Sequence, residues 1–309
     1  MFDEAPGNRG AGDGSMGGPP GGPLRGPLRG PLRWQSQAVL LAFVPIAATW
    51  VTLVGGQVWQ AGDPALAQAV VISIAFAALG YQMRAVTRGA ALTGGIFTAA
   101  LYLQTPGWHT ALWPVLALYL MTYAATRFGR RRKEALGTAE GRRGRAASQV
   151  AANLGVAVLA GIPISAAHVF SVTPFGGRTA VMAMIAAMAE ATADTISSEM
   201  GQVLGGEPRM ITTFRRVPVG TDGAITLVGS LAGCVAAAVL VAVAAFVLPM
   251  RRVDALIALG AGIIGLFVDS LLGAIPERRG WLNNDAVNTL STLVAALLAA
   301  ESVRFLPGL

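Results

Sequence analysis

Charged residues are scarce in this sequence of 309 residues, in which Asp, Glu, Lys and Arg together make up only 13%. A soluble domain carries roughly 25%. Apolar residues reach 54%, and the mean hydropathy is +0.58. So little polar surface cannot cover a globule in water, which excludes a soluble fold and predicts that long segments lie in lipid.

Cysteine and lysine are nearly missing as well. The single cysteine, Cys234, excludes an internal disulfide framework and a cysteine-based metal cluster. Lys133 is the only lysine, and no Gly-x-x-x-x-Gly-Lys sequence occurs, which excludes a Walker-type nucleotide loop. The net charge of +7 would suit nucleic acid, but basic residues in a membrane protein more often set its topology, so we expect no nucleic-acid partner.

The N-terminal segment, residues 1–33, differs from the rest in composition. It holds 10 Gly and 6 Pro and ends in a repeated Gly-Pro-Leu-Arg. Such a segment buries almost no apolar surface and is predicted to be a disordered tail. Its Arg25, Arg29 and Arg33 precede the first apolar run, where they would hold this end in the cytoplasm.

Residues 34–305 contain recurring apolar segments, each long enough to cross ~30 Å of hydrocarbon. One of them, Gly89–Thr126, is long enough to cross twice, with a turn at Thr105-Pro106-Gly107. We therefore expect an all-α, polytopic helical bundle of about nine transmembrane helices. The segments are Trp34–Gly62, Pro64–Met83, Gly89–Thr126, Ala146–Gly177, 179–200, Gly223–Met250, 255–276 and 286–305.

The basic residues fix an expected orientation. With the N-terminus in the cytoplasm, 19 of the 23 basic residues fall on the inner side, as the positive-inside rule requires. This predicts a multi-pass protein of the cell membrane with a cytoplasmic N-terminus. The loops 127–147, 201–222 and 275–285 would then face the cytoplasm, where nucleotides are found.

Acidic residues inside the apolar segments are the main functional signal, because each costs roughly 2.5–3.5 kcal/mol to insert. Glu190 and Asp194 are four residues apart and share a helix face, and Asp269 lies toward the same end of a later segment. Carboxylates at one membrane face suit Mg²⁺, which proteins usually hold with one or two carboxylates plus substrate phosphates. We take these three as catalytic candidates and the following five as candidate metal ligands: Glu190, Asp194, Glu199, Asp269 and Asp285.

Two alternatives stay open for these residues. The acids could instead form hydrogen bonds between helices, and Asn283 or Asn284 could be a helix N-cap. Glu199 lies about 140° around the helix from Asp194, so a single helix cannot easily direct both toward one ion.

Candidate phosphate-binding residues lie in the loops next to these acids. Gly220-Thr221-Asp222-Gly223 lies directly before an expected helix, where backbone N–H groups and the helix dipole attract anions. The alternative is a capped turn with topogenic arginines, and the basic loop 127–147 could equally contact anionic lipid. The full set is Lys133, Arg142, Arg143, Asn153, Arg215, Arg216, Gly220, Thr221, Gly223 and Asn284.

Several motifs resemble those of the phytyl-phosphate kinase and transmembrane-protein-19-like family of integral membrane proteins, long classed as a domain of unknown function. The resemblance covers about 85–305. It also extends, more distantly, to the CTP-using dolichol kinases and phosphatidate cytidylyltransferases through the Asp-x-x-x-Ser-x-x-Gly pattern of Asp194 to Gly201. The motifs are Ala193-Asp194-Thr195 through Ser198-Glu199-x-Gly201, Ile211-Thr212-Thr213, Val217-Pro218-x-Gly220-Thr221-x-Gly223, Gly229, Asp269-Ser270-x-x-Gly273-Ala274, Asn284-Asp285-x-x-Asn288 and Lys133 with Arg142-Arg143 and Gln149-Val150-x-x-Asn153.

The resemblance implies a prenyl monophosphate kinase that makes the diphosphate from a nucleoside triphosphate, CTP or ATP, with Mg²⁺. The prenyl chain would lie between helices in the bilayer, with its phosphate on Arg215 and Arg216 or on Arg142 and Arg143. Asp222 inside the glycine turn would repel phosphate unless a metal intervenes. A cation- or proton-coupled transporter that uses the intramembrane carboxylates and a CTP-dependent cytidylyltransferase are the alternatives.

Overall fold

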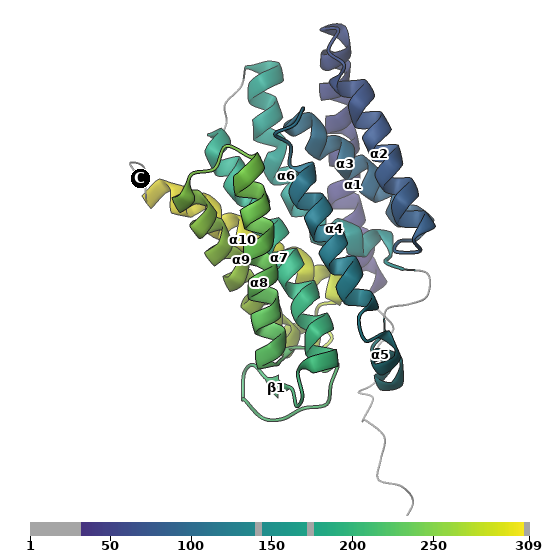
Figure 1. The fold of residues 1–309 in the computed structure, drawn as a ribbon, viewed down its shortest axis with the longest axis vertical. Helices are drawn as coiled ribbons and strands as arrows, with labels where there is room; N and C mark the ends of the chain where they lie inside the picture. Colours follow the sequence, from purple (N-terminus) through teal and green to yellow (C-terminus); the bar gives the residue numbers. More distant parts are fainter. Residues whose placement is uncertain (1–31, 140–143, 172–175, 306–309) are drawn as a thin grey trace, which may run out of the picture. The chain divides into compact units, whose positions relative to one another are not determined.

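The computed structural model describes residues 32–139, 144–171 and 176–305. The predicted tail of residues 1–33 lies outside the described residues except for its last two, and Arg142 and Arg143 also lie outside them. The elements appear in Figure 1, and their bounds are as follows. They are α1 (Arg33–Gln60), α2 (Ala65–Gln82), α3 (Arg88–Gln104), α4 (Leu112–Arg127), α5 (Arg130–Leu136), α6 (Ala147–Phe170), α7 (Gly177–Leu204), β1 (Arg209–Met210), β2 (Ala224–Ile225), α8 (Leu227–Val247), α9 (Arg252–Leu272), the π-helical turn η1 (Gly273–Glu277) and α10 (Asn284–Phe305).

The all-α, polytopic fold predicted from the apolar segments is confirmed. Each expected span coincides with one long helix in the described part of the chain, and the turn after Thr105 separates α3 from α4. Seven of these helices are long and apolar enough to cross a membrane. At 17 and 16 residues, α3 and α4 are shorter than the roughly 20 residues that span the hydrocarbon.

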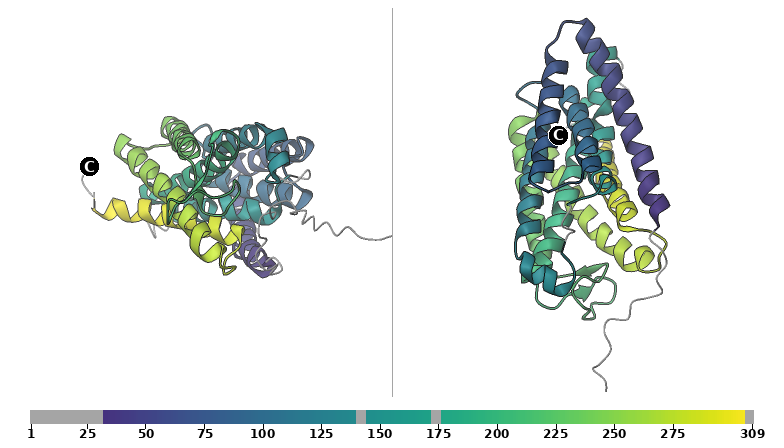
Figure 2. Two further views of the ribbon diagram at one scale, coloured as in Figure 1. Left: turned by 90° about the horizontal axis from the view of Figure 1, so that it is seen from below. Right: turned by 90° about the vertical axis from the view of Figure 1, so that its right-hand side faces the viewer.

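Helix α7 lies at the centre of the bundle. It packs against α4, α6, α8, α9 and α10, and every residue from Ala180 to Ala193 is buried. Seen from below in Figure 2, the purple and blue helices α1–α4 lie toward the right and the green and yellow helices α8–α10 toward the left. The segment that carries Glu190 and Asp194 is therefore enclosed by protein rather than by lipid.

Glycines bring α8 and α9 close to this central helix. A Cβ atom on Gly233 of α8 would lie 2.7 Å from the Ala193 carbonyl oxygen, and one on Gly265 of α9 would lie 2.6 Å from Cγ of Glu190. Small residues at such crossings let helix backbones approach closely, which is how helices associate in lipid. The glycine at 265 thus makes room for an acidic side chain between two helices.

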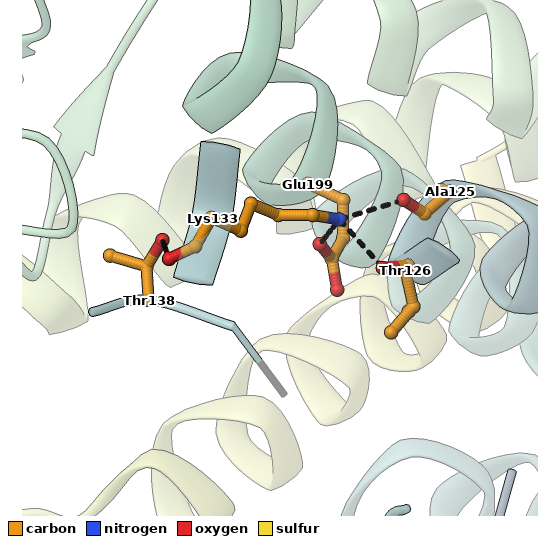
Figure 3. Close-up of polar contacts among 5 residues, drawn as sticks. All are labelled: Ala125, Thr126, Lys133, Thr138 and Glu199. Carbon is orange, nitrogen blue, oxygen red and sulfur yellow. Dashed lines mark hydrogen bonds and ion pairs between the residues drawn. The ribbon is translucent and has the colours of Figure 1, made fainter. Parts of the chain in front are cut away.

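The only lysine of the chain joins α5 to α4 and α7. Lys133 is fully buried, and its Nζ donates hydrogen bonds to the carbonyl oxygens of Ala125 and Thr126, at 2.9 and 2.7 Å, and to Oε2 of Glu199 at 2.6 Å (Figure 3). An ammonium group has three N–H donors, so these contacts engage all of them. The two carbonyls belong to the last turn of α4, where backbone acceptors lack partners within the helix.

We predict that Lys133→Met destabilises the fold by about 3–5 kcal/mol, because it leaves the largely buried carboxylate of Glu199 and two carbonyls without this donor. The double variant Lys133→Met/Glu199→Gln should recover part of this loss, since the unpaired charge is gone. Thermal unfolding of the detergent-solubilised protein, followed by tryptophan fluorescence, measures the effect. The control is Arg130→Ala on the same helix, which removes only the exposed pair with Glu134. Equal unfolding midpoints for Lys133→Met and this control would contradict the prediction.

Candidate functional site

A polar pocket of about 310 Å³ opens at the end of the bundle that carries β1, the lower end in Figure 1. Its walls come from α6, α7, α9, η1 and α10 and from the loop between α7 and α8. It brings together side chains that lie more than 140 residues apart in the sequence. The polar residues in its lining are Thr138, Arg145, Gln149, Asn153, Asp194, Thr195, Ser197, Ser198, Glu199, Gln202, Thr221, Asp222, Thr226, Asp269, Ser270, Glu277, Asn284 and Asn288.

Asp194 of α7 and Asp269 of α9 form the centre of this pocket. Both side chains line it, and the two helices that carry them pack against each other. Ser291 Oγ of α10 donates a hydrogen bond to Oδ2 of Asp269 at 3.2 Å. The structure thus brings together the two acids that the sequence analysis placed on separate spans.

Glu190, the third catalytic candidate, lies one helical turn deeper than Asp194. It is only 1% exposed, and it does not line the pocket. Its Oε1 has no hydrogen-bond partner among the described residues. A buried acid without a full set of partners is costly, and in a membrane segment it is a candidate functional residue.

The predicted metal ligands do not all converge. Within the described ranges no group of three or more His, Cys, Asp and Glu side chains is arranged to hold a metal ion. Glu199 lines the pocket but pairs with Lys133. Asp285 does not line it, because its Oδ2 accepts a hydrogen bond from Ser36 Oγ at 2.6 Å. Asp194 and Asp269 remain, and two carboxylates are enough for Mg²⁺ when substrate phosphates supply further ligands.

The charge of the lining fits such an ion. Of the described residues, five acidic ones and a single basic one, Arg145, line the pocket. Glu199 is balanced by its ion pair with Lys133, whereas neither Asp194 nor Asp269 forms an ion pair with a described residue. Burial raises the pKa of Asp222 in the adjoining turn, although the nearby Arg278 guanidinium opposes this. Such a pocket repels a bare phosphate and attracts one that arrives with a divalent cation.

The glycine turn reaches the pocket, but not as the start of a helix. Gly220 and Gly223 have φ of 83° and 73°, and a Cβ on Gly223 would lie 2.2 Å from the backbone nitrogen of Ala274. Residues 224–225 form β2, which pairs with β1, so α8 begins only at Leu227. The expectation that the turn directly precedes the helix is therefore wrong. The Thr226 hydroxyl caps α8 by accepting a hydrogen bond from the Gly229 N–H.

Most of the predicted phosphate-binding cations lie outside the pocket lining. Arg215 and Arg216 do not line it. Arg216 forms an exposed ion pair with Glu207 at 2.8 Å. Lys133 is buried, with its donors engaged as described above. Among the predicted phosphate ligands, Asn153, Gly220, Thr221, Gly223 and Asn284 do line the pocket.

Sequence reasoning missed two charged lining residues, Arg145 and Glu277. Glu277 follows Asp269 by eight residues at the end of the same helical segment, and that spacing was an available signal. Arg145 is one of many basic residues in its loop, so nothing in the sequence singles it out. In the structure its backbone is fixed to the α2–α3 turn by hydrogen bonds from Arg145 N to Ala85 O, 2.9 Å, and from Thr87 N to Arg145 O, 3.0 Å.

Comparison with known proteins places the chain among membrane proteins that are largely uncharacterized. An uncharacterized membrane protein of Methanocaldococcus jannaschii is 44% identical over 124 residues, which is 40% of this chain and about half, 52%, of that protein. Protein VTE6, chloroplastic, of Arabidopsis thaliana is 29% identical over 80% of this chain and 74% of its own length. An uncharacterized membrane protein of Synechocystis sp. is 32% identical, covering 67% of this chain and 76% of that protein. No solved structure matches the chain.

The family assignment follows from the extent of the match. Residues 71–296 match the family described as "Integral membrane protein DUF92". This range includes every described residue that lines the polar pocket. The chain therefore belongs to the DUF92 family of integral membrane proteins.

Proposed function

We propose that the protein is a membrane-embedded phosphotransferase that converts a prenyl monophosphate to the diphosphate with a nucleoside triphosphate. The observation that carries this proposal is that Asp194 and Asp269, from two helices packed together, line one acidic pocket at one end of a membrane bundle. The motifs that contain these two residues also resemble the phytyl-phosphate kinase family. The similarity to VTE6 over 80% of the chain is consistent with this assignment.

In this reaction an oxygen of the prenyl phosphate attacks the γ-phosphorus of the nucleotide. One P–O bond forms, the bond from that phosphorus to the β–γ bridging oxygen breaks, and the nucleoside diphosphate leaves with the electron pair. The attacking oxygen is already negatively charged, so the enzyme needs no general base and acts mainly by positioning and charge neutralisation. Magnesium, when bound, would supply that neutralisation.

The side chains of the pocket divide these tasks. Asp194 and Asp269 would hold Mg²⁺. Glu190, behind them, would add to the negative field that favours a divalent cation at the pair. Arg145, the basic residue of the lining, would bind the phosphate of the acceptor, and the turn from Gly220 to Gly223 would contact the nucleotide phosphates through its backbone.

The orientation in the membrane follows from the same assignment. The pocket lies at the end that carries β1, η1 and α5. Most of the basic residues belong to the loops at this end, which the positive-inside rule places in the cytoplasm. We propose that the pocket faces the nucleotide pool and that the protein resides in the cell membrane with its N-terminus on the same side.

Asp194→Asn and Asp269→Asn should each lower diphosphate formation by about 100-fold or more, since each removes a charge that holds the metal. The assay uses purified protein in detergent with phytyl monophosphate, Mg²⁺ and labelled ATP or CTP. Glu207→Gln makes the same chemical change at an exposed ion pair outside the pocket and should leave the rate unchanged. Full activity of Asp194→Asn would remove that residue from the mechanism.

The products separate kinase chemistry from its alternatives. A kinase releases a nucleoside diphosphate, and chelation of divalent cations should abolish the reaction until Mg²⁺ is restored. Release of pyrophosphate from CTP would instead identify a cytidylyltransferase. Cation or proton flux in proteoliposomes without nucleotide, lost in Asp194→Asn, would identify a transporter and contradict the proposal.

A further inference from the structure

A second, apolar cavity of about 150 Å³ lies between α2, α3, α4 and α6. Its walls include Phe76, Val115, Leu118 and Leu154, together with small residues of α3. The backbone here leaves space, since a Cβ added to Gly94 of α3 would meet no atom within 4 Å. Apolar walls of this kind bind hydrocarbon rather than a polar ligand.

The apolar cavity and the polar pocket share two residues, Arg145 and Asn153. Asn153 is held in place because its Oδ1 accepts a hydrogen bond from Asn288 Nδ2 at 2.9 Å. The Arg145 backbone is fixed by its bonds to the α2–α3 turn. The Arg145 guanidinium makes no hydrogen bond or ion pair with another described residue, so its donors are available at the boundary between the two spaces.

The charges on the two sides of this boundary are opposite. Among the described residues, five of the six charged side chains that line the polar pocket are acidic, whereas the rim of the apolar cavity carries Arg84, Arg127, Arg130 and Arg145 and no acid. A bare phosphate is therefore favoured at the cavity rim and a metal-bound phosphate in the pocket. This arrangement would keep the acceptor and donor phosphates on separate sides until they meet at Arg145.

We propose that this cavity binds the isoprenoid chain of the substrate, with the substrate's phosphate on Arg145. This inference rests on the proposed function and adds to it a location for the chain and a residue for the head group. The ligand is an anionic amphiphile with one flexible hydrocarbon chain. A two-chain phospholipid of the surrounding bilayer is the competing occupant, and the experiments below distinguish it.

Filling the cavity tests the placement of the chain. Gly94→Leu should raise the KM for geranylgeranyl monophosphate by about tenfold or more, because each methylene forced out of apolar contact weakens binding roughly fourfold. The KM for dimethylallyl monophosphate, which has only five carbons, should stay within about twofold. Gly56→Leu in α1 is the matched control, since its added Cβ also meets nothing within 4 Å and it does not line the cavity.

A binding measurement keeps the inference separate from catalysis. A geranylgeranyl monophosphate with a diazirine at its far end should label α3, α4 or α6 in the unmodified protein without nucleotide. Excess geranylgeranyl monophosphate should prevent the labelling, and excess dioleoyl phosphatidic acid should not. Arg145→Met should weaken labelling by the phosphate probe more than labelling by the corresponding alcohol.

The outcomes separate the two proposals. Labelling of these helices without any diphosphate formation would overturn the kinase proposal and support the chain site. Kinase activity with labelling elsewhere, or with equal KM changes for both chain lengths in Gly94→Leu, would overturn the chain site. Displacement of the probe by dioleoyl phosphatidic acid would assign the cavity to membrane lipid instead.

Discussion

Three acidic side chains, Glu190, Asp194 and Asp269, gather where α7 meets α9, in a part of the molecule that excludes most water. Desolvation of carboxylates is expensive, and the close packing around them must offset that cost. The alanine-rich stretch of α7 is enclosed on all sides, and glycines such as Gly265 let the neighbouring helices approach it. The polar pocket opens where this packing ends. The enclosed helix therefore determines both where the acids lie and from which side a ligand reaches them.

The helical architecture could be predicted from the sequence because uncharged stretches of about 20 residues have few alternatives in lipid. The meeting of Asp194 with Asp269 was also accessible, since both lie near the C-terminal ends of hydrophobic segments that are separated by one other segment and therefore cross the membrane in the same direction. The start of α8 was not, because pairing of Ala224 and Ile225 with β1 depends on a partner strand 15 residues away. Tertiary pairing of this kind leaves no periodic signal in a sequence.

Long-range partners also explain why the basic residues were hard to assign from sequence. The patterns of Lys133, Arg145 and Arg216 all suit contact with phosphate, yet the structure gives each a different environment. One is buried against carbonyls and a carboxylate, one lies at the boundary of two cavities, and one pairs with Glu207 at the surface. The sequence shows that an arginine or lysine side chain is positively charged and will bind an anionic or electronegative group. Which group it binds depends on the fold.

The burial of Lys133 has a consequence for chemical modification. As the only lysine in the sequence, it is the sole side chain with a primary amine, and its Nζ is enclosed by Ala125, Thr126 and Glu199. Acylating reagents and amine-directed crosslinkers therefore have no side-chain target on the surface of the folded protein. Acylation of Lys133 requires the contact between α4, α5 and α7 to open. The rate of acylation at this residue therefore measures how often this part of the folded protein unfolds locally.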